Sequence, residues 1–246
     1  MMLASGPPAD LLARDDAEPW ADPAQHPVWT AVRSGAAPPG AARAVVLALY
    51  PVFTGRARYM LAAKVSWISL ADGKEIFADL HRALTVADAD ADAGWAAAAR
   101  GLGITDAELA GARAAPPAEA ADLVAVTREH GLRSAHEGTG VAWALDRRLP
   151  ALTGQLADAL AGHYSVGESA LRHLRYRAAE ADAAAARVGR LTRAYLTTAW
   201  QVYEARRAAR EVLWGITALL EAAAAEPAPS ESAPSESARI EEANGG

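Results

Sequence analysis

The segment from Gly162 to Glu180 gathers more side chains that can do chemistry than any other part of the chain. Within it, His173, Arg177 and Glu180 follow a spacing of four and then three residues. In a helix, such positions fall within about 60° of one another and make one polar stripe. An imidazole transfers protons near neutral pH, and a guanidinium binds carboxylates. The stripe is therefore a candidate for proton transfer to a bound anion.

The helix that must carry this stripe is predicted from a capping pattern. Ser165 is followed three residues later by Glu168, so a helix should begin there and continue through Glu180. Its apolar sector includes Leu171 and Leu174, which places the stripe at the edge of the expected core. A solvated row of side chains is the commoner outcome at such an edge, although a pocket wall is the alternative. The pattern alone therefore favours a surface row.

Two further titratable side chains stand out on other segments. His81 lies in an amphipathic stretch from Lys74 to Leu84, where it is a candidate metal ligand or general base. Asp146 follows a small apolar run over residues 140–145, which places a carboxylate near a buried helix. Neither residue has the spacing of an established ligand motif. Taken alone, each is more consistent with an ordinary surface or partly buried residue.

Several common kinds of site are excluded by what the sequence lacks. The absence of cysteine removes disulfides, thiolate metal sites and cysteine nucleophiles. His130 and His136 do not form the His-x-x-x-His spacing of a zinc motif. The glycines at 101 and 103 lack the third glycine and the lysine of the known phosphate loops. No nucleophile elbow supports a serine triad.

Charge and hydropathy exclude two kinds of partner. The formal net charge is −6 and no basic run occurs, so nucleic acid is not an expected partner. No uncharged apolar run approaches the roughly 18 residues of a membrane span, and the first residues do not resemble a targeting signal. We therefore expect a cytoplasmic protein that does not enter the membrane.

Helical periodicity and the abundance of alanine predict an all-α fold. We expect a flexible lead-in over residues 1–21, one helical domain over 22–224, and a disordered acidic Pro/Ser/Glu tail over 225–246. The apolar segment from Ala41 to Leu70, kinked or divided by Pro51, is interpreted as helical; a competing strand over 44–53 is discounted because no second strand accompanies it. Further signals are helix starts at Asp22, Thr105 and Pro117, a stop at Pro150, and bends at Gly189 or Thr197–Thr198.

Four segments, taken in order, resemble the helical haem-oxygenase-like superfamily, in particular its branch of pyrroloquinoline-quinone synthase and thiaminase II. They cover about residues 22 to 222 and are Gln25–Trp29 with Gly35, Leu49–Phe53, Gly101–Leu109, and His163–Tyr164 followed by His173–Arg177. The resemblance implies a single haem-oxygenase-like helical bundle and a homodimer. Thiaminase-type hydrolysis is not expected, because that activity in the family depends on a cysteine.

The resemblance also implies roles for individual residues. His81 falls where the family places a pocket histidine, and Asp146 where it has an acidic pocket residue. His173 falls where the synthase has tyrosine and its di-iron oxidase relatives have a histidine ligand. Arg177 matches the synthase's pocket arginine, whereas Glu180 replaces the last histidine of the di-iron relatives. The sequence thus combines features of two branches.

We therefore expect an oxygen-dependent oxidoreductase acting on a small anionic or amino-acid-derived molecule inside the bundle. His81, Asp146, His173 and Arg177 are the expected catalytic residues, and His26, Tyr50 and Arg177 the expected pocket wall. Two ways of using oxygen are possible. Either non-haem iron is held by His81, Asp146, His173 and Glu180, or the oxidation takes place without a cofactor. The alternative is a non-catalytic member of the fold that binds a metabolite or a protein partner.

Overall fold

The computed structural model describes residues 22–54, 92–147 and 149–225, and every regular element in this part of the chain is a helix. The predicted all-α helical bundle is thus confirmed. His81, the expected lead-in over 1–21 and the expected tail over 225–246 lie outside the described residues, except for Ala225, which is the last residue of α12. The elements are the 3-10 helix η3 (Pro23–Gln25), the π-helix η4 (Trp143–Arg147), an unlabelled helix over residues 92–101, and the α-helices α2 (Pro27–Ser34), α3 (Pro39–Phe53), α6 (Asp106–Ala114), α7 (Ala118–Arg133), α8 (Ala135–Ala142), α9 (Leu149–His163), α10 (Glu168–Ala179), α11 (Ala181–Tyr195) and α12 (Ala199–Ala225).

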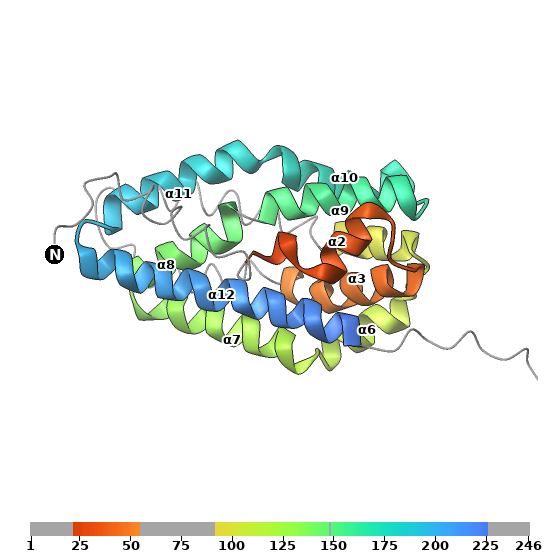
Figure 1. Cartoon of the computed structure of the whole chain (residues 1–246), viewed down its shortest axis with the longest axis horizontal. Coiled ribbons are helices and arrows are strands. Elements are labelled where there is room, and N and C mark those ends of the chain that lie inside the picture. Colours follow the sequence, from red (N-terminus) through yellow and green to blue (C-terminus); the bar gives the residue numbers. More distant parts are fainter. Residues whose placement is uncertain (1–21, 55–91, 148, 226–246) are drawn as a thin grey trace, which may run out of the picture.

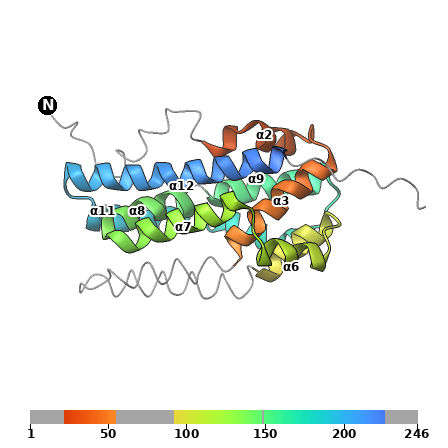
Figure 2. The ribbon, with the colours of Figure 1, turned by 90° about the horizontal axis from the view of Figure 1, so that it is seen from below.

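Helix α12 is the long element around which the bundle is arranged. Its 27 residues run beside α7, α8 and α3, and α10 pairs with α9 on the opposite side of the bundle (Figures 1 and 2). The face of α12 toward the bundle is apolar and buried, with Val212, Ile216 and Leu219 among its residues. Burial of this face against three other helices stabilises the long helix more than its intrinsic propensity does.

The apolar segment expected to start at Ala41 belongs to α3, which is helical from Pro39 to Phe53, while its part over 55–70 lies outside the described residues. Pro51 lies inside the last turn of α3, where it removes one backbone donor. Thr54 closes the helix: its backbone N–H and its hydroxyl both donate to the carbonyl of Tyr50, at 3.0 and 2.7 Å. The discounted strand is therefore absent from residues 44–53.

The predicted first helix is divided in two. Asp22 caps η3 by accepting a hydrogen bond from the N–H of Ala24 at 3.0 Å, as its position before Pro23 indicated. His26 is extended, with φ −60° and ψ 135°, because Pro27 disfavours the helical conformation in the residue that precedes it. A second helix, α2, begins at Pro27 and ends at Ser34, and Gly35, with a φ of 74°, is its C-cap.

The two predicted capping boxes have opposite outcomes. Thr105 and Glu108 form the reciprocal box that starts α6, so that prediction is confirmed. The prediction at Ser165 is wrong: α10 begins at Glu168, and Ser165 has a φ of 57° in the preceding turn. Glu168 instead accepts a hydrogen bond from Arg175, at 3.1 Å, which ties the first two turns of α10 together.

Two other predicted boundaries also differ. Pro150 does not stop a helix but is the second residue of α9, a position where a missing N–H leaves no helical bond unmade. The chain bends at Thr197–Thr198, as predicted, and Gly189 lies within α11 without ending it. The continuous helix expected through Glu180 is wrong, because α10 ends at Ala179 and α11 starts at Ala181, although no helix-breaking residue marks this junction.

Candidate functional site

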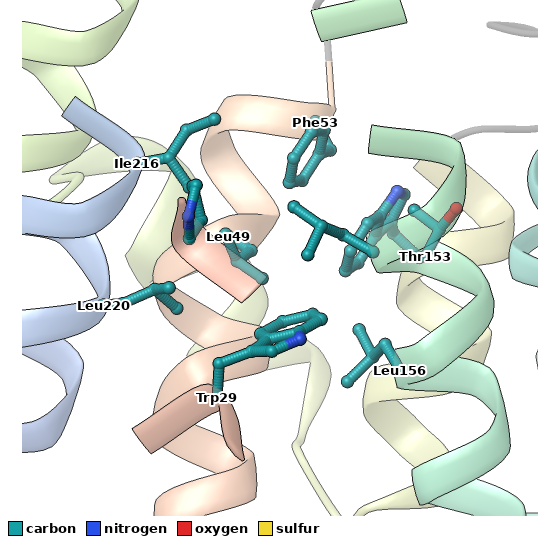
Figure 3. Close-up of a pocket in the computed structure, with 10 residues that line it drawn as sticks. Trp29, Leu49, Phe53, Thr153, Leu156, Ile216 and Leu220 are labelled. Carbon is teal, nitrogen blue, oxygen red and sulfur yellow. The ribbon is translucent and has the colours of Figure 1, made fainter. Parts of the chain in front are cut away.

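A small cavity lies in the core between helices from distant parts of the sequence. The indole of Trp29, the ring of Phe53 and the side chains of Leu156 and Ile216 point into it (Figure 3). Its volume is about 20 Å³, enough for one water-sized molecule. The lining residues are Pro23, Trp29, Leu49, Phe53, Trp95, Leu152, Thr153, Leu156, Ile216 and Leu220.

The walls of this cavity are held by aromatic contacts. The rings of Phe53 and Trp95 stack with their centroids 4.9 Å apart and their planes 7° from parallel. The indole N–H of Trp29 donates to the side-chain oxygen of Gln155 at 3.0 Å, so its polar atom is satisfied within the protein. Among the described lining residues, Thr153 is the one polar side chain besides the indoles of Trp29 and Trp95. The cavity is therefore suited to a small, uncharged, apolar molecule, because a charged group there would lose its hydration and gain no compensating hydrogen bonds.

His173 is brought against the helix over residues 92–101, which forms one wall of the cavity. Its side chain is buried, and a Cβ atom added at Gly94 would lie 2.1 Å from the Cβ of His173. Only glycine leaves room for this approach. Trp95, the next residue, lines the cavity. His173 thus packs against the helical turn whose Trp95 lines the cavity. The sequence pattern did not indicate this contact.

Asp146 is buried in the π-helical turn η4, which continues directly from α8. π-Helical turns are rare and occur frequently at functional sites. The turn packs against α8, α9, α11 and α12, so Asp146 lies in the body of the bundle. Asp146 is therefore a buried acidic residue, whereas the pocket role that the resemblance implies for it stays a prediction.

Arg177 and Glu180 are half-buried at the end of α10. Arg177 lies one turn after His173, whereas Glu180 is the junction residue between α10 and α11, with φ −77° and ψ 2°. Its N–H donates to the carbonyl of Tyr176 at 3.1 Å. The stripe was expected from three positions of one helix. Two of its residues, His173 and Arg177, lie on α10, whereas Glu180 is the C-cap of that helix.

The expected pocket-wall residues His26 and Tyr50 have local structural partners. The Nδ1 atom of His26 accepts from the N–H of Val28 at 3.3 Å and caps α2, while burial lowers the pKa of its imidazole and Glu221 opposes that shift. The hydroxyl of Tyr50 accepts from Arg113 at 3.0 Å, and the guanidinium lies 5.3 Å from the centre of the ring. Neither lines the cavity, and their role in a pocket stays a prediction.

The His163–Tyr164 pair joins two connections between helices. The Tyr164 hydroxyl donates to the carbonyl of Ala37 at 3.0 Å, and burial raises the pKa of this phenol. A Cβ atom at Gly35 would lie 2.6 Å from Cγ of His163. The pair therefore fixes the end of α9 against the turn between α2 and α3, which is a positioning role.

A buried ionic network that the sequence reading missed joins α7, α8 and α12. The Nδ1 atom of His130 lies 2.5 Å from Oε2 of Glu137, and its Nε2 lies 2.7 Å from Oε2 of Glu211. Arg133 and Arg207 also approach the Glu137 carboxylate, at 3.3 and 3.5 Å. His130 and Glu211 are 81 residues apart, so no local spacing reveals the contact.

The expected iron site cannot be assembled from described residues alone. No group of three or more histidine, aspartate or glutamate side chains in residues 22–54, 92–147 and 149–225 is arranged to hold a metal ion. Asp146, His173 and Glu180 therefore do not make a three-donor group among themselves. The expected set also needs His81, which lies outside the described residues, and the iron site stays a prediction.

The chain is similar in structure to a TenA homologue from Pseudomonas syringae pv. tomato, whose crystal structure superimposes with a TM-score of 0.73. The sequences are 16% identical, and the match covers 91% of this chain and 98% of the other. No family model and no curated protein sequence matches the chain. The similarity establishes the fold, in agreement with the expected haem-oxygenase-like bundle, and the closer relation to the quinone synthase stays a prediction. No helix in the described part of the chain is long and apolar enough to span a bilayer.

Proposed function

We propose that this protein is an enzyme that processes a small metabolite inside the helical bundle, and that the reaction is an oxidation by molecular oxygen. The observation that carries the proposal is the apolar cavity beside the helix against which His173 packs. Dioxygen is small and uncharged, so it enters an apolar cavity of this size without losing hydrogen bonds. The fold shared with a TenA homologue supports an enzyme that acts on a small molecule.

In the proposed reaction, the substrate loses two electrons and two protons, and dioxygen accepts them to become hydrogen peroxide. His173 accepts one of the protons, because it is a buried imidazole next to a cavity wall. Arg177, one turn away on α10, binds a carboxylate of the substrate. Asp146, buried in the η4 turn, is the proposed base, and no step requires a metal.

The cavity and the catalysis are tested separately. Xenon binds apolar cavities and can be used as a probe in place of dioxygen. Adding the wild-type protein to dissolved xenon should therefore change the ¹²⁹Xe chemical shift. Leu156→Trp fills the space and should abolish that response. Oxygen uptake and peroxide release are then measured with a panel of amino-acid-derived and other anionic metabolites. We expect equal amounts of oxygen consumed and peroxide formed for the true substrate.

His173→Ala should abolish turnover while leaving xenon binding intact, because His173 does not line the cavity. The matched control is His136→Ala, a half-buried histidine on α8, which should remain active. Metal analysis of the active protein, grown with and without iron, distinguishes oxidation with non-haem iron from oxidation without a cofactor. The oxidase proposal fails if a metabolite that stabilises the protein is never oxidised.

Binding without catalysis is the second candidate, and one observation favours it. Among the described residues that line the cavity, Thr153 is the one polar side chain besides the indoles of Trp29 and Trp95, and none is an acid or base. Of these residues, none would transfer a proton to a molecule held there. Under this alternative, a small apolar ligand raises the unfolding temperature and is recovered unchanged, in the wild type and in His173→Ala alike.

A further inference from the structure

His130 lies between two carboxylates at the junction of α7, α8 and α12. Its side chain is buried, its Nδ1 atom lies 2.5 Å from Oε2 of Glu137, and its Nε2 atom lies 2.7 Å from Oε2 of Glu211. A neutral imidazole has one N–H and one lone pair, so it can donate to only one of these carboxylates. An imidazolium donates to both. The geometry at His130 therefore fits the doubly protonated ring.

The charges around His130 favour the same form of the ring. The described chain places two guanidinium groups and three carboxylates in this cluster, namely Arg133, Arg207, Glu137, Glu204 and Glu211. With an imidazolium, the cluster has three cations and three anions, whereas a neutral imidazole leaves one anion without a cation. The Glu137 carboxylate is deeply buried, and a buried anion is costly unless cations balance it. The hydrogen bond from Arg207 to Glu204 raises the pKa of the guanidinium, so Arg207 stays a cation.

The helices that pack here also carry charged groups that bind outside the cluster. Glu129 on α7 pairs with Arg133 at the surface, where its side chain is exposed. On α3, which also packs on α7, Arg43 pairs with Glu108 of α6. The groups that face the imidazole directly are therefore the two carboxylates at its nitrogens.

Glu211 has an alternative partner beside the imidazole. Its second carboxylate oxygen, Oε1, lies 4.0 Å from Nη1 of Arg207. The Nε atom of Arg207 is buried and has no hydrogen-bond acceptor among the described residues. The side chain of Glu211 is 37% exposed, against 3% for Glu137, so Glu211 is the carboxylate that can move. A shift of Glu211 from His130 toward Arg207 would strengthen its ion pair with this guanidinium.

We propose that His130 is a proton-dependent latch between α7 and α12. While the ring carries both protons, its Nε2–H donates to Glu211 and holds α12 on α7. When the pH rises, the Nε2 proton leaves to solvent, because Glu211 can be hydrated whereas the buried Glu137 needs the Nδ1–H. Nε2 then presents a lone pair to a carboxylate, and the two repel each other. Glu211 turns to Arg207, and the polar link between α7 and α12 is lost.

The latch acts on a helix that forms part of the cavity wall. Ile216 and Leu220 of α12 line the cavity. Beside them, Gly215 packs so closely on α7 that an added Cβ atom would lie 2.8 Å from Cδ1 of Leu123. Glu211 lies one turn before Gly215, so its release loosens α12 next to the cavity. The latch requires none of the chemistry proposed above, because it needs only the cluster at His130.

The protonation of the ring is followed by ¹⁵N NMR of the full chain labelled at histidine, from about pH 5 to 9, which spans the usual range of imidazole titration. His130→Gln identifies the signals of this ring by their loss. We expect both nitrogens of His130 to be protonated at the acid end, and Nε2 alone to lose its proton as the pH rises. A ring that is neutral at the acid end overturns the latch, as does a ring that keeps both protons throughout.

Hydrogen exchange measures the contact between α7 and α12. Rates in both helices are compared with those of α9 at each pH, because the chemical exchange step itself accelerates with pH. Loss of a charge-assisted hydrogen bond should speed exchange in α7 and in the middle of α12 roughly tenfold or more relative to α9. This step must coincide with the titration of His130. A constant ratio across that titration overturns the latch.

Glu211→Gln is the decisive variant, because a side-chain amide can accept from a protonated Nε2 and donate to a neutral one. The exchange step should therefore disappear, with the contact kept at high pH. His130→Gln should also abolish the step, whereas the control His136→Gln, at a half-buried histidine on α8, should retain it. A step that persists in Glu211→Gln overturns the latch, as does its loss in His136→Gln. Circular dichroism checks folding, and if His130→Gln does not fold, the shift of the Nε2 signal in Glu211→Gln assigns the ring instead.

Discussion

Replacing Leu156 by alanine tests the apolar cavity through the stability of the protein. Leu156 is 2% exposed and lines the cavity on the side of α9. The substitution removes three carbon atoms, which corresponds to about 2.4 kcal/mol at about 0.8 kcal/mol per methylene. The surroundings relax only partly into the vacated space, and this raises the expected loss to about 3–4 kcal/mol. Such a loss is a large share of the roughly 5–15 kcal/mol that stabilises a typical domain.

Urea unfolding followed by circular dichroism measures this loss, provided that the slope of the transition stays unchanged. Leu132→Ala is the matched control, because Leu132 is 42% exposed on α7 and should change stability by less than about 0.5 kcal/mol. The enlarged cavity should also accept benzene, which at about 100 times its dissociation constant would restore about 2.7 kcal/mol. A loss below about 1 kcal/mol, with no response to benzene, would show that α9 does not pack around this space.

Three further predictions concern local contacts. Gly94→Ala should destabilise the protein and displace His173, since the added methyl carbon would lie 2.1 Å from the Cβ of the histidine. The displacement should change the NMR resonances of the His173 ring, and unchanged resonances would contradict that packing. Thr105→Ala should cost about 1 kcal/mol by urea unfolding through loss of the α6 cap, whereas Ser165→Ala, outside any cap, should change stability by less than about 0.5 kcal/mol. Burial lowers the pKa of His26, so the folded state resists its protonation, and the free energy of unfolding should fall as the pH drops below about 6.5. His26→Asn keeps a capping side chain and should reduce the slope of stability against pH between pH 7 and 5. An identical slope would refute the assignment.

Local sequence signals predicted the elements whose causes are themselves local. The box at Thr105, the cap at Asp22 and the bend at Thr197–Thr198 each depend on contacts within about four residues, and all three are present. Ser165 shows the limit of this reasoning. It has the required partner three residues later, but its φ of 57° places it in the turn that leads Val166 into the core. Tertiary burial of Val166 thus shifted the start of α10 to Glu168.

The parts of the candidate site that the sequence did not indicate depend on contacts between distant segments. The cavity is lined from η3, α2, α3, the helix over 92–101, α9 and α12, and its residues are ordinary core residues in any local pattern. His130 likewise appeared unremarkable, because its carboxylate partners belong to two other helices. Periodicity states which face of a helix is buried, but it carries no information on which helix covers that face.

The apolar cavity and the buried histidine meet at one helical wall. Trp95 turns its ring into the cavity, whereas the missing side chain of Gly94 makes room for His173. Successive side chains of a helix point about 100° apart, so the two environments lie on different sides of the same turn. In the proposed reaction, the uncharged reactant would occupy the apolar side, and His173 would accept a proton on the other side. We then expect a substrate with a carboxylate to approach from the side of His173 and Arg177, because the apolar side would remove the hydration of the charge with no partner to replace it.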